Sequence, residues 1–121
     1  MSASGTSIRL HQMGAEMQQC INECLACHAL CLETITYCVQ KGGKHVEQSH
    51  LQLLTDCAEA CQVSANFMCR GSELHGRYCA VCAEVCNQCA ESCDKFGDDE
   101  QMKACAEACR RCAESCQRMA A

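Results

Sequence analysis

Cysteine, a soft metal ligand and a nucleophile once ionised, recurs along this chain at helical spacing. Of the 121 residues, seventeen are cysteine. Most of them form three runs in which neighbours lie three or four residues apart, and at about 100° per residue this spacing places each run along one side of an α-helix. The runs are Cys20, Cys24, Cys27, Cys31; Cys79, Cys82, Cys86, Cys89, Cys93; and Cys105, Cys109, Cys112, Cys116.

The other four cysteines extend this pattern less tightly. Cys38, eighteen residues after Cys20, returns to the arc of the first run at the helical period. A further segment carries Cys57, Cys61 and Cys69, with His50, Leu54, Ser64 and Met68 at its other inward positions. We therefore treat all seventeen cysteines as candidate metal ligands and expect the second segment to contribute a mixed face.

Free thiols bound to metal are the preferred interpretation of these stripes. Buried cysteine can serve as a small apolar side chain, but leucine or isoleucine in the same pattern would give a more stable core. Helical neighbours three or four residues apart have Cβ atoms about 5–6 Å apart, whereas a disulfide needs about 3.5–4.5 Å. A reducing cytosol would also keep the thiols free. The sequence thus favours metal binding over a disulfide framework.

The metal best suited to a continuous array of thiolates is Cu(I). Soft thiolates select Cu(I), zinc and iron–sulfur clusters. Each CxxC pair here lies inside a continuing helical run, which weakens it as a zinc motif, and the proline-terminated ferredoxin run is absent. One Cu(I) per thiolate leaves a nearly neutral array, whereas each zinc tetrathiolate keeps a charge of about −2 that is unfavourable to bury.

Four helices should carry the stripes. The pattern predicts helices over residues 14–41, 46–70, 72–95 and 98–119, separated by glycines, and the chain contains no proline. Ser72 is the expected N-cap of the third helix, and Asp98 with Gln101 resembles a capping box on the fourth. Short links predict an all-α, antiparallel four-helix bundle with a cysteine-lined core. Residues 14–121 would form this bundle, after an N-terminal segment 1–13 with room for a short helix.

The antiparallel layout gathers other soft ligands at one end of the bundle. Thioether and imidazole groups are neutral Cu(I) ligands, so this end is predicted to be the mouth through which ions enter. Methionines that plug a bundle end are the alternative. The residues concerned are Met13, Met17, Met68, His75 and Met119, which we add to the candidate metal ligands, with His11 beside them. The opposite end would hold Cys38, His45, His50, Cys93 and Met102, with Phe96 as a plug, and a second opening at that end stays an alternative.

Several function classes are disfavoured. No apolar stretch is long enough to cross a bilayer and the N-terminus lacks a secretion signal, so we expect a cytoplasmic protein without a membrane partner. A net charge of −5 argues against a nucleic-acid partner. Cys27 and His28 point about 100° apart on a helix, which is unsuited to a catalytic dyad, and phosphate-binding motifs are absent. We therefore expect that this protein is not an enzyme.

The first predicted helix also carries a second apolar band. Its members are Ile21, Leu25, Leu32, Ile35 and Val39. The band could pack against a neighbouring helix or form a subunit interface, and we favour the interface because sulfur already occupies the bundle axis.

The repeated CxxxCxxCxxxC runs on four predicted helices resemble the bacterial four-helix-bundle copper storage proteins over about residues 14–119, and the absence of an export signal resembles their cytosolic branch. The resemblance implies a homotetramer whose bundles each bind many Cu(I) ions through the cysteines named above. It points to cytosolic Cu(I) storage and detoxification, with copper delivered by a chaperone or a small thiol. The alternatives are a metallothionein-like zinc or cadmium buffer with about a quarter of that stoichiometry, and a thiol redox buffer without metal.

Overall fold

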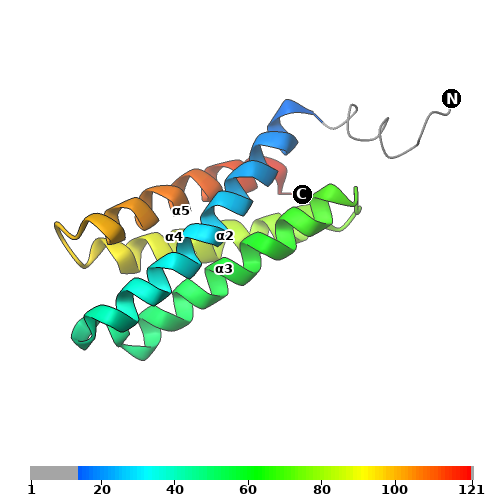
Figure 1. Cartoon of the computed structure of the whole chain (residues 1–121). Coiled ribbons are helices and arrows are strands. Elements are labelled where there is room, and N and C mark those ends of the chain that lie inside the picture. The colour runs from blue at the N-terminus through cyan, green and yellow to red at the C-terminus, as the bar shows by residue number, and fades with distance from the viewer. Residues whose placement is uncertain (1–13, 121) are drawn as a thin grey trace, which may run out of the picture.

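Four long α-helices make up most of the part of the chain that the computed structural model describes, residues 14–120. They are α2 (Ala15–Lys41), α3 (Gln48–Cys69), α4 (His75–Asp94) and α5 (Glu100–Met119), and a short 3-10 turn, η1 (Gly43–Val46), joins the first two. Successive helices run in opposite directions (Figure 1). The predicted all-α, antiparallel four-helix bundle is confirmed.

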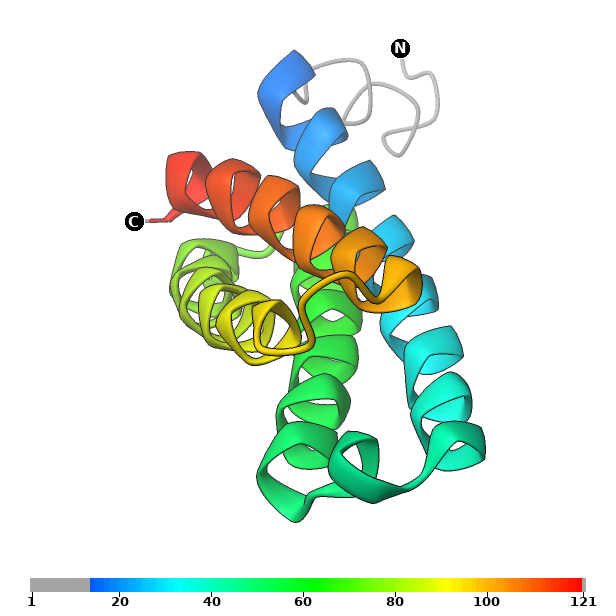
Figure 2. The same ribbon diagram turned by 90° about the vertical axis from the view of Figure 1, so that its left-hand side faces the viewer.

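The helices pack as a closed ring of four neighbours. α2 packs against α3 and α5, and α4 packs against the same two helices from the other side. Figure 2 shows that the α2–α3 pair is inclined to the α4–α5 pair. Each helix therefore turns one face toward a common interior, which is where the thiol stripes were expected. No helix in residues 14–120 is long and apolar enough to cross a membrane.

Glycines end two of the helices. Gly42 and Gly43 have φ values of 71° and 58°, in the left-handed region that glycine adopts without strain. The Gly42 amide donates to the Cys38 carbonyl at 2.9 Å and so closes the last turn of α2. Gly97, with φ of 63°, follows α4 as predicted.

Both predicted helix N-caps are displaced. α4 begins at His75 after Leu74, because the Ser72 hydroxyl accepts the nearby Leu74 amide at 3.1 Å in a local turn. At α5 the cap is Asp99, whose Oδ1 accepts the Met102 amide at 3.1 Å. The Ser72 and Asp98 predictions are therefore wrong by two residues and one residue.

The second helix starts later than predicted. The capping box predicted for the fourth helix does not form, because Asp98 is not the N-cap. Residues 43–46 form the 3-10 turn, so α3 begins at Gln48 and not near Val46. Gln101, the expected partner in the capping box, donates its side-chain amide to Thr34 Oγ1 at 3.0 Å and ties α5 to α2.

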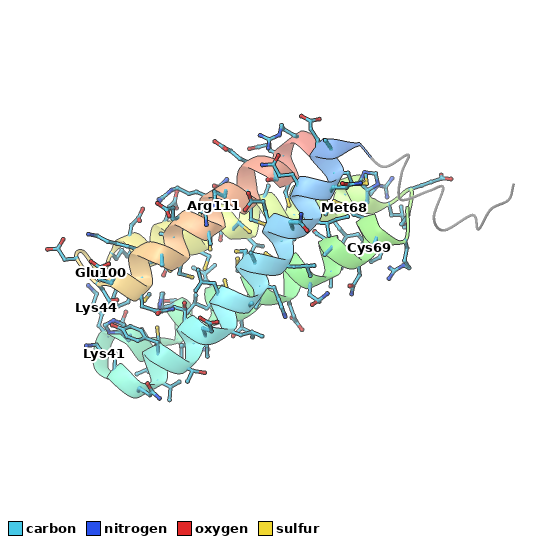
Figure 3. The ribbon with its side chains drawn as sticks, turned by 45° about the horizontal axis from the view of Figure 1, so that its top comes forward. Lys41, Lys44, Met68, Cys69, Glu100 and Arg111 are labelled. Atoms are coloured by element: carbon cyan, nitrogen blue, oxygen red, sulfur yellow. The ribbon has the colours of Figure 1, made fainter. Side chains whose placement is uncertain are left out.

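The bundle interior is built mainly of sulfur. Sixteen of the seventeen cysteines are buried, with small alanines between them and Leu54, Met68 and Met102 as the largest apolar fillers. Cys69 is the exception because its side chain is exposed. At the helical period Cys69 lies about 80° from Cys61, whereas Met68 lies about 20° from it and takes the inward position (Figure 3). The prediction that Cys69 faces the core is wrong.

Candidate metal centre

Sulfurs of α2 and α5 face each other along the length of the interior. Because the two helices are antiparallel, early cysteines of one meet late cysteines of the other, and the pairs follow one another in register. The Sγ–Sγ distances are Cys20–Cys116 3.6 Å, Cys24–Cys116 3.5 Å, Cys24–Cys112 3.6 Å, Cys27–Cys109 3.7 Å and Cys31–Cys105 4.0 Å. One wall of the core is thus a continuous row of thiols.

The two buried cysteines of α3 connect this wall to α4. The Sγ atom of Cys57 lies 3.8 Å from that of Cys27, 3.8 Å from that of Cys109 and 3.5 Å from that of Cys86. Cys61 similarly lies 3.7 Å from Cys112, 3.7 Å from Cys86 and 3.8 Å from Cys82. Although α3 carries few cysteines, its two buried thiols lie at the centre of the bundle, where they connect the sulfurs of the other three helices.

We call the buried cysteine sulfurs of these four helices, apart from that of Cys38, the sulfur column. At least five groups of four within it have all their Sγ atoms within 4.8 Å of one another. The groups are Cys24, Cys82, Cys112, Cys116; Cys27, Cys31, Cys57, Cys109; Cys27, Cys57, Cys61, Cys86; Cys31, Cys89, Cys105, Cys109; and Cys61, Cys82, Cys86, Cys112. These five groups use only twelve different sulfurs. Most groups therefore share ligands, as bridging thiolates would.

The electrostatic surroundings of the column favour a neutral metal complex. The buried polar side chains in residues 14–120 are Thr34, His50, Ser64, Ser92 and Ser115, and no lysine or arginine is buried there. Three of the five groups share no sulfur with one another and could hold three separate zinc tetrathiolates. Each would keep a charge of about −2 with no buried cation beside it. Cu(I), at one ion per thiolate, avoids this charge.

The thiols influence one another's ionisation. Hydrogen bonding to Cys109 lowers the pKa of Cys27, whereas hydrogen bonding to Cys112 raises the pKa of Cys61. Desolvation raises the pKa of the Cys38 thiol to about 11, and the neighbouring charges of Cys105 and Asp99 act in the same direction. A first thiolate is stabilised by the S–H groups around it and opposes the next ionisation, so the cluster titrates as a unit. Metal binding must then displace protons.

The predicted mouth lies at the end that joins the N-termini of α2 and α4 to the C-termini of α3 and α5 (Figure 1). Met68 is fully buried there, while Met17, His75 and Met119 are half-buried. His75 Nδ1 lies 2.8 Å from the Ser72 carbonyl, to which it donates, so Nε2 of the neutral ring keeps its lone pair. Met13 and His11 lie outside the described residues. The ligand role of the other four remains a prediction.

The opposite end, which we call the closed end, is covered by rings and hydrogen bonds. The Phe96 ring lies 4.4 Å from His45 and 4.7 Å from His50 between ring centroids, the position expected of a plug. Asp99 Oδ2 accepts the Tyr37 hydroxyl at 2.8 Å and lies 2.9 Å from His45 Nε2.

Hydrogen bonding holds the pKa of Asp99 low. Desolvation, the largest single effect, raises this pKa, but the hydrogen bonds from Tyr37, His45 and the Met102 amide, together with the charge of His45, lower it further than desolvation raises it. Neither Tyr37 nor Asp99 was identified from the sequence as part of this end, since each contacts its partner across more than fifty residues.

Cys38 and Met102 lie beneath this cover, together with His50. Cys38 Sγ is 3.5 Å from His50 Nε2 and 3.9 Å from Met102 Sδ, and His50 Nδ1 is 2.8 Å from Ser92 Oγ. The sequence placed Cys38, His50 and Met102 at this end. It did not identify Ser92, whose only signal is a position about 60° from Cys89 around the helix.

His28 takes no part in the thiol chemistry. Its Nδ1 lies 2.7 Å from the Ala58 carbonyl, whereas the neighbouring Cys27 sulfur contacts Cys31, Cys57 and Cys109. The Cys27 thiol thus belongs to the sulfur column, whereas the His28 ring joins α2 to α3.

Comparison with known proteins identifies chains with the same arrangement. The sequence profile of a family described as copper storage protein (Csp) matches residues 13–121. The Nmul_A1745 protein from Nitrosospira multiformis is 45% identical, with a TM-score of 0.81 over 87% of this chain and 94% of that chain. Cu(I)-bound BsCsp3 of Bacillus subtilis is 33% identical, with a TM-score of 0.81 over 88% of this chain and 99% of that chain.

A third structure extends the comparison to another bacterium. The copper storage protein Ccsp from Streptomyces lividans, loaded with 10 copper equivalents, is 29% identical, with a TM-score of 0.74 over 86% of this chain and 83% of that chain. Another structure from the same organism is described as that of a cytosolic copper storage protein with five coppers.

Proposed function

This chain belongs to the copper storage protein family, and from that premise we propose that its sulfur column stores many Cu(I) ions, each held by cysteine thiolates. The observation that carries the proposal is the overlap of four-thiol groups in a core that, within residues 14–120, contains no buried lysine or arginine. Shared thiolates suit an ion that accepts few ligands and lets each sulfur bridge to the next ion. A capacity near the number of buried thiols, sixteen, balances the charge.

Loading would proceed from the mouth inward. Met17, Met68, His75 and Met119 would receive Cu(I) through neutral ligands, joined by Met13 as the sequence predicts. They would pass the ion to Cys20, Cys79 and Cys116 at the mouth end of the column. Each transfer to a thiol releases a proton because the thiolate is the ligand. Affinity should rise inward as thiolates replace thioether and imidazole. Cys69 has no place in this path because it is exposed.

The physiological role that fits is storage and detoxification in the cytoplasm, not catalysis. A row of equivalent thiolate sites is suited to withholding ions, and the Streptomyces relative is described as cytosolic. Copper would be delivered by a chaperone or a small thiol, either of which can exchange Cu(I) directly between sulfur ligands. No nucleic acid or membrane is needed as a partner.

We further propose a homotetramer. Leu25, Leu32 and Val39 recur every seven residues on α2 and are 41%, 48% and 61% exposed, whereas Ile21 and Ile35 of the same predicted band pack against the core. An exposed apolar row at heptad spacing is typical of a helix that packs against a partner helix. Light scattering should give the mass of four chains, and Leu32→Glu should reduce it. A monomeric wild-type chain would contradict the proposal.

A zinc or cadmium buffer is the second candidate, favoured by the three four-thiol groups that share no sulfur. The two proposals differ about fourfold in capacity. An anaerobic titration of the reduced protein with Cu(I), in competition with a chromophoric chelator, should show about sixteen ions withheld. Zinc should saturate near three or four and bind more weakly. Cu(I) binding that stops at one or two ions, or preferential zinc binding, would refute copper storage.

A further inference from the structure

We propose that Cys38, His50 and Met102 form a separate Cu(I) site of mixed donors at the closed end, distinct from the sulfur column. It would bind one ion through a thiolate, an imidazole and a thioether. The inference rests on the proposed function only for the identity of the ion.

The donor atoms come from three helices and meet at one sulfur. Cys38 of α2 lies 3.5 Å from His50 Nε2 of α3 and 3.9 Å from Met102 Sδ of α5. Sulfur and nitrogen ligands of a d10 ion such as zinc lie about 2.0–2.3 Å from the metal, so donors spread around a three-coordinate ion are about 3.5–4.0 Å apart. Both distances from Cys38 fall in this range, and little movement would be needed to admit an ion.

The site differs in chemistry from the column. The hydrogen bonds of Cys38 are to histidine and methionine, whereas those of Cys27, Cys57 and Cys61 are to other cysteines. Cys38 belongs to none of the five four-thiol groups described above. One thiolate with two neutral ligands makes a neutral complex with one Cu(I), so the site can fill without sharing a ligand with a neighbouring ion.

The histidine is oriented for this role. His50 is 3% exposed, and its Nδ1 lies 2.8 Å from Ser92 Oγ. When Nδ1–H donates to the serine hydroxyl, the Nε2 lone pair faces Cys38. A second hydrogen bond that fixes the tautomer and the ring plane is the usual support of a metal-binding histidine. Ser92 therefore acts as a positioning residue.

The cover over the site excludes water and separates it from the outside. Phe96 packs on His50, and Lys44 places its ammonium group 5.2 Å from the Phe96 ring centroid while donating to the Lys95 carbonyl at 3.1 Å. Lys44 and Glu100 mark this end of the bundle in Figure 3. An ion would reach the site through the column. A purely structural role for the three residues predicts no change in their ligation state as the column fills.

The test is nuclear magnetic resonance of the full chain during anaerobic Cu(I) loading, with 13C-labelled methionine methyl groups and 15N-labelled histidine rings. Met102→Leu and His50→Gln variants assign the two resonances. Binding predicts that the Met102 methyl signal shifts and that His50 Nε2 acquires the shift of a metal-bound nitrogen. In Cys38→Ser both changes should be lost, while the column keeps its capacity to within about two ions.

Two outcomes would overturn the inference. If both signals stay unmoved when chelator competition shows the column full, Cys38, His50 and Met102 only pack the closed end. Equal shifts in Cys38→Ser would show that the thiolate is not a ligand. Failure of the whole chain to retain Cu(I) against the chelator would instead refute the proposed function, and the mixed-donor site with it. Since the wild-type signals carry the decisive result, a variant that folds poorly does not prevent a decision.

Discussion

Cys57→Ser is the sharpest test of the sulfur column, because this one sulfur connects three helices. Its Sγ lies within 3.8 Å of the sulfurs of Cys27, Cys86 and Cys109, and it belongs to two of the five four-thiol groups. Serine keeps the shape of the side chain and removes the soft ligand. Cys69→Ser is the matched control, since Cys69 is the exposed cysteine of the same helix.

The expected loss follows from this geometry. With one Cu(I) per buried thiolate, the wild-type chain holds about sixteen ions. Removal of Cys57 takes away one negative charge and one bridge between two groups, so one to two ions should be lost. The control should lose none. A buried serine without a partner costs about 1–3 kcal/mol in stability, but on a helix its hydroxyl can donate to the carbonyl four residues earlier, so we expect the lower end of that range.

Native mass spectrometry of the anaerobically loaded proteins counts the ions directly, because each one adds a fixed mass. Circular dichroism before loading checks that both variants are folded. Loss of one or two ions from Cys57→Ser, with the wild-type number in Cys69→Ser, would support the column. Equal capacity in the two variants would show that the bound ions do not depend on the central sulfurs, which contradicts the sulfur column as the storage site.

Four further predictions concern the caps, the pH dependence and the metal-free state. Asp99→Ala should lower the free energy of unfolding, measured by urea denaturation, by about 1–3 kcal/mol, because it removes an N-cap and two side-chain hydrogen bonds. Substitution of the exposed neighbour, Asp98→Ala, should change it by less than about 0.5 kcal/mol. Equal effects of the two substitutions would contradict the assignment of the cap to Asp99. Burial lowers the pKa of His50 in the folded protein. The neutral imidazole therefore contributes stability above the pKa of the unfolded state, and this contribution is lost as the pH falls through the folded pKa. The urea midpoint of the metal-free protein should thus be lower at pH 4 than at pH 7, and a larger decrease of the midpoint in the His50→Gln variant than in the wild type would contradict this assignment. The pKa of Cys38 is about 11, and thiols are generally protonated at neutral pH. Loading of the protein with Cu(I) in a pH-stat should therefore release about one proton per bound Cu(I) ion. If no protons were released, the thiols would already be ionised before the metal binds. The reduced, metal-free protein should keep its helical circular dichroism, because alanines, Leu54 and the Asp99 cap support the bundle without metal, and a coil spectrum would show that metal drives folding.

The inward thiols were predictable because they depend on a local rule. A helix fixes the angle between residues, so the runs on α2, α4 and α5 had to face one way and had to be buried once four helices packed together. The same rule, applied more strictly, would have excluded Cys69, since Met68 lies closer to the direction of Cys61. The inward arc of α3 is narrow, because Met68 fills the position that faces the core and Cys69 beside it is exposed.

The helix starts and the closed end depend on contacts that the sequence does not reveal. Asp98 and Asp99 are equally good caps by composition, and Asp99 is selected because Tyr37 of the neighbouring α2 and His45 of η1 bond to its side chain. Ser72 is a suitable cap residue that forms a local turn with Leu74 instead. Ser92 becomes visible as the partner of His50 only when α3 and α4 are packed together.

The most direct test of copper storage in the sulfur column is a crystal structure of the Cu(I)-loaded chain with anomalous diffraction measured at the copper absorption edge. Copper storage in this column predicts a row of anomalous peaks along the bundle axis, each within bonding distance of two or more buried cysteine sulfurs, and no peak beside Cys69. Peaks confined to the mouth or to surface residues, or a few isolated sites each surrounded by four thiolates, would contradict it.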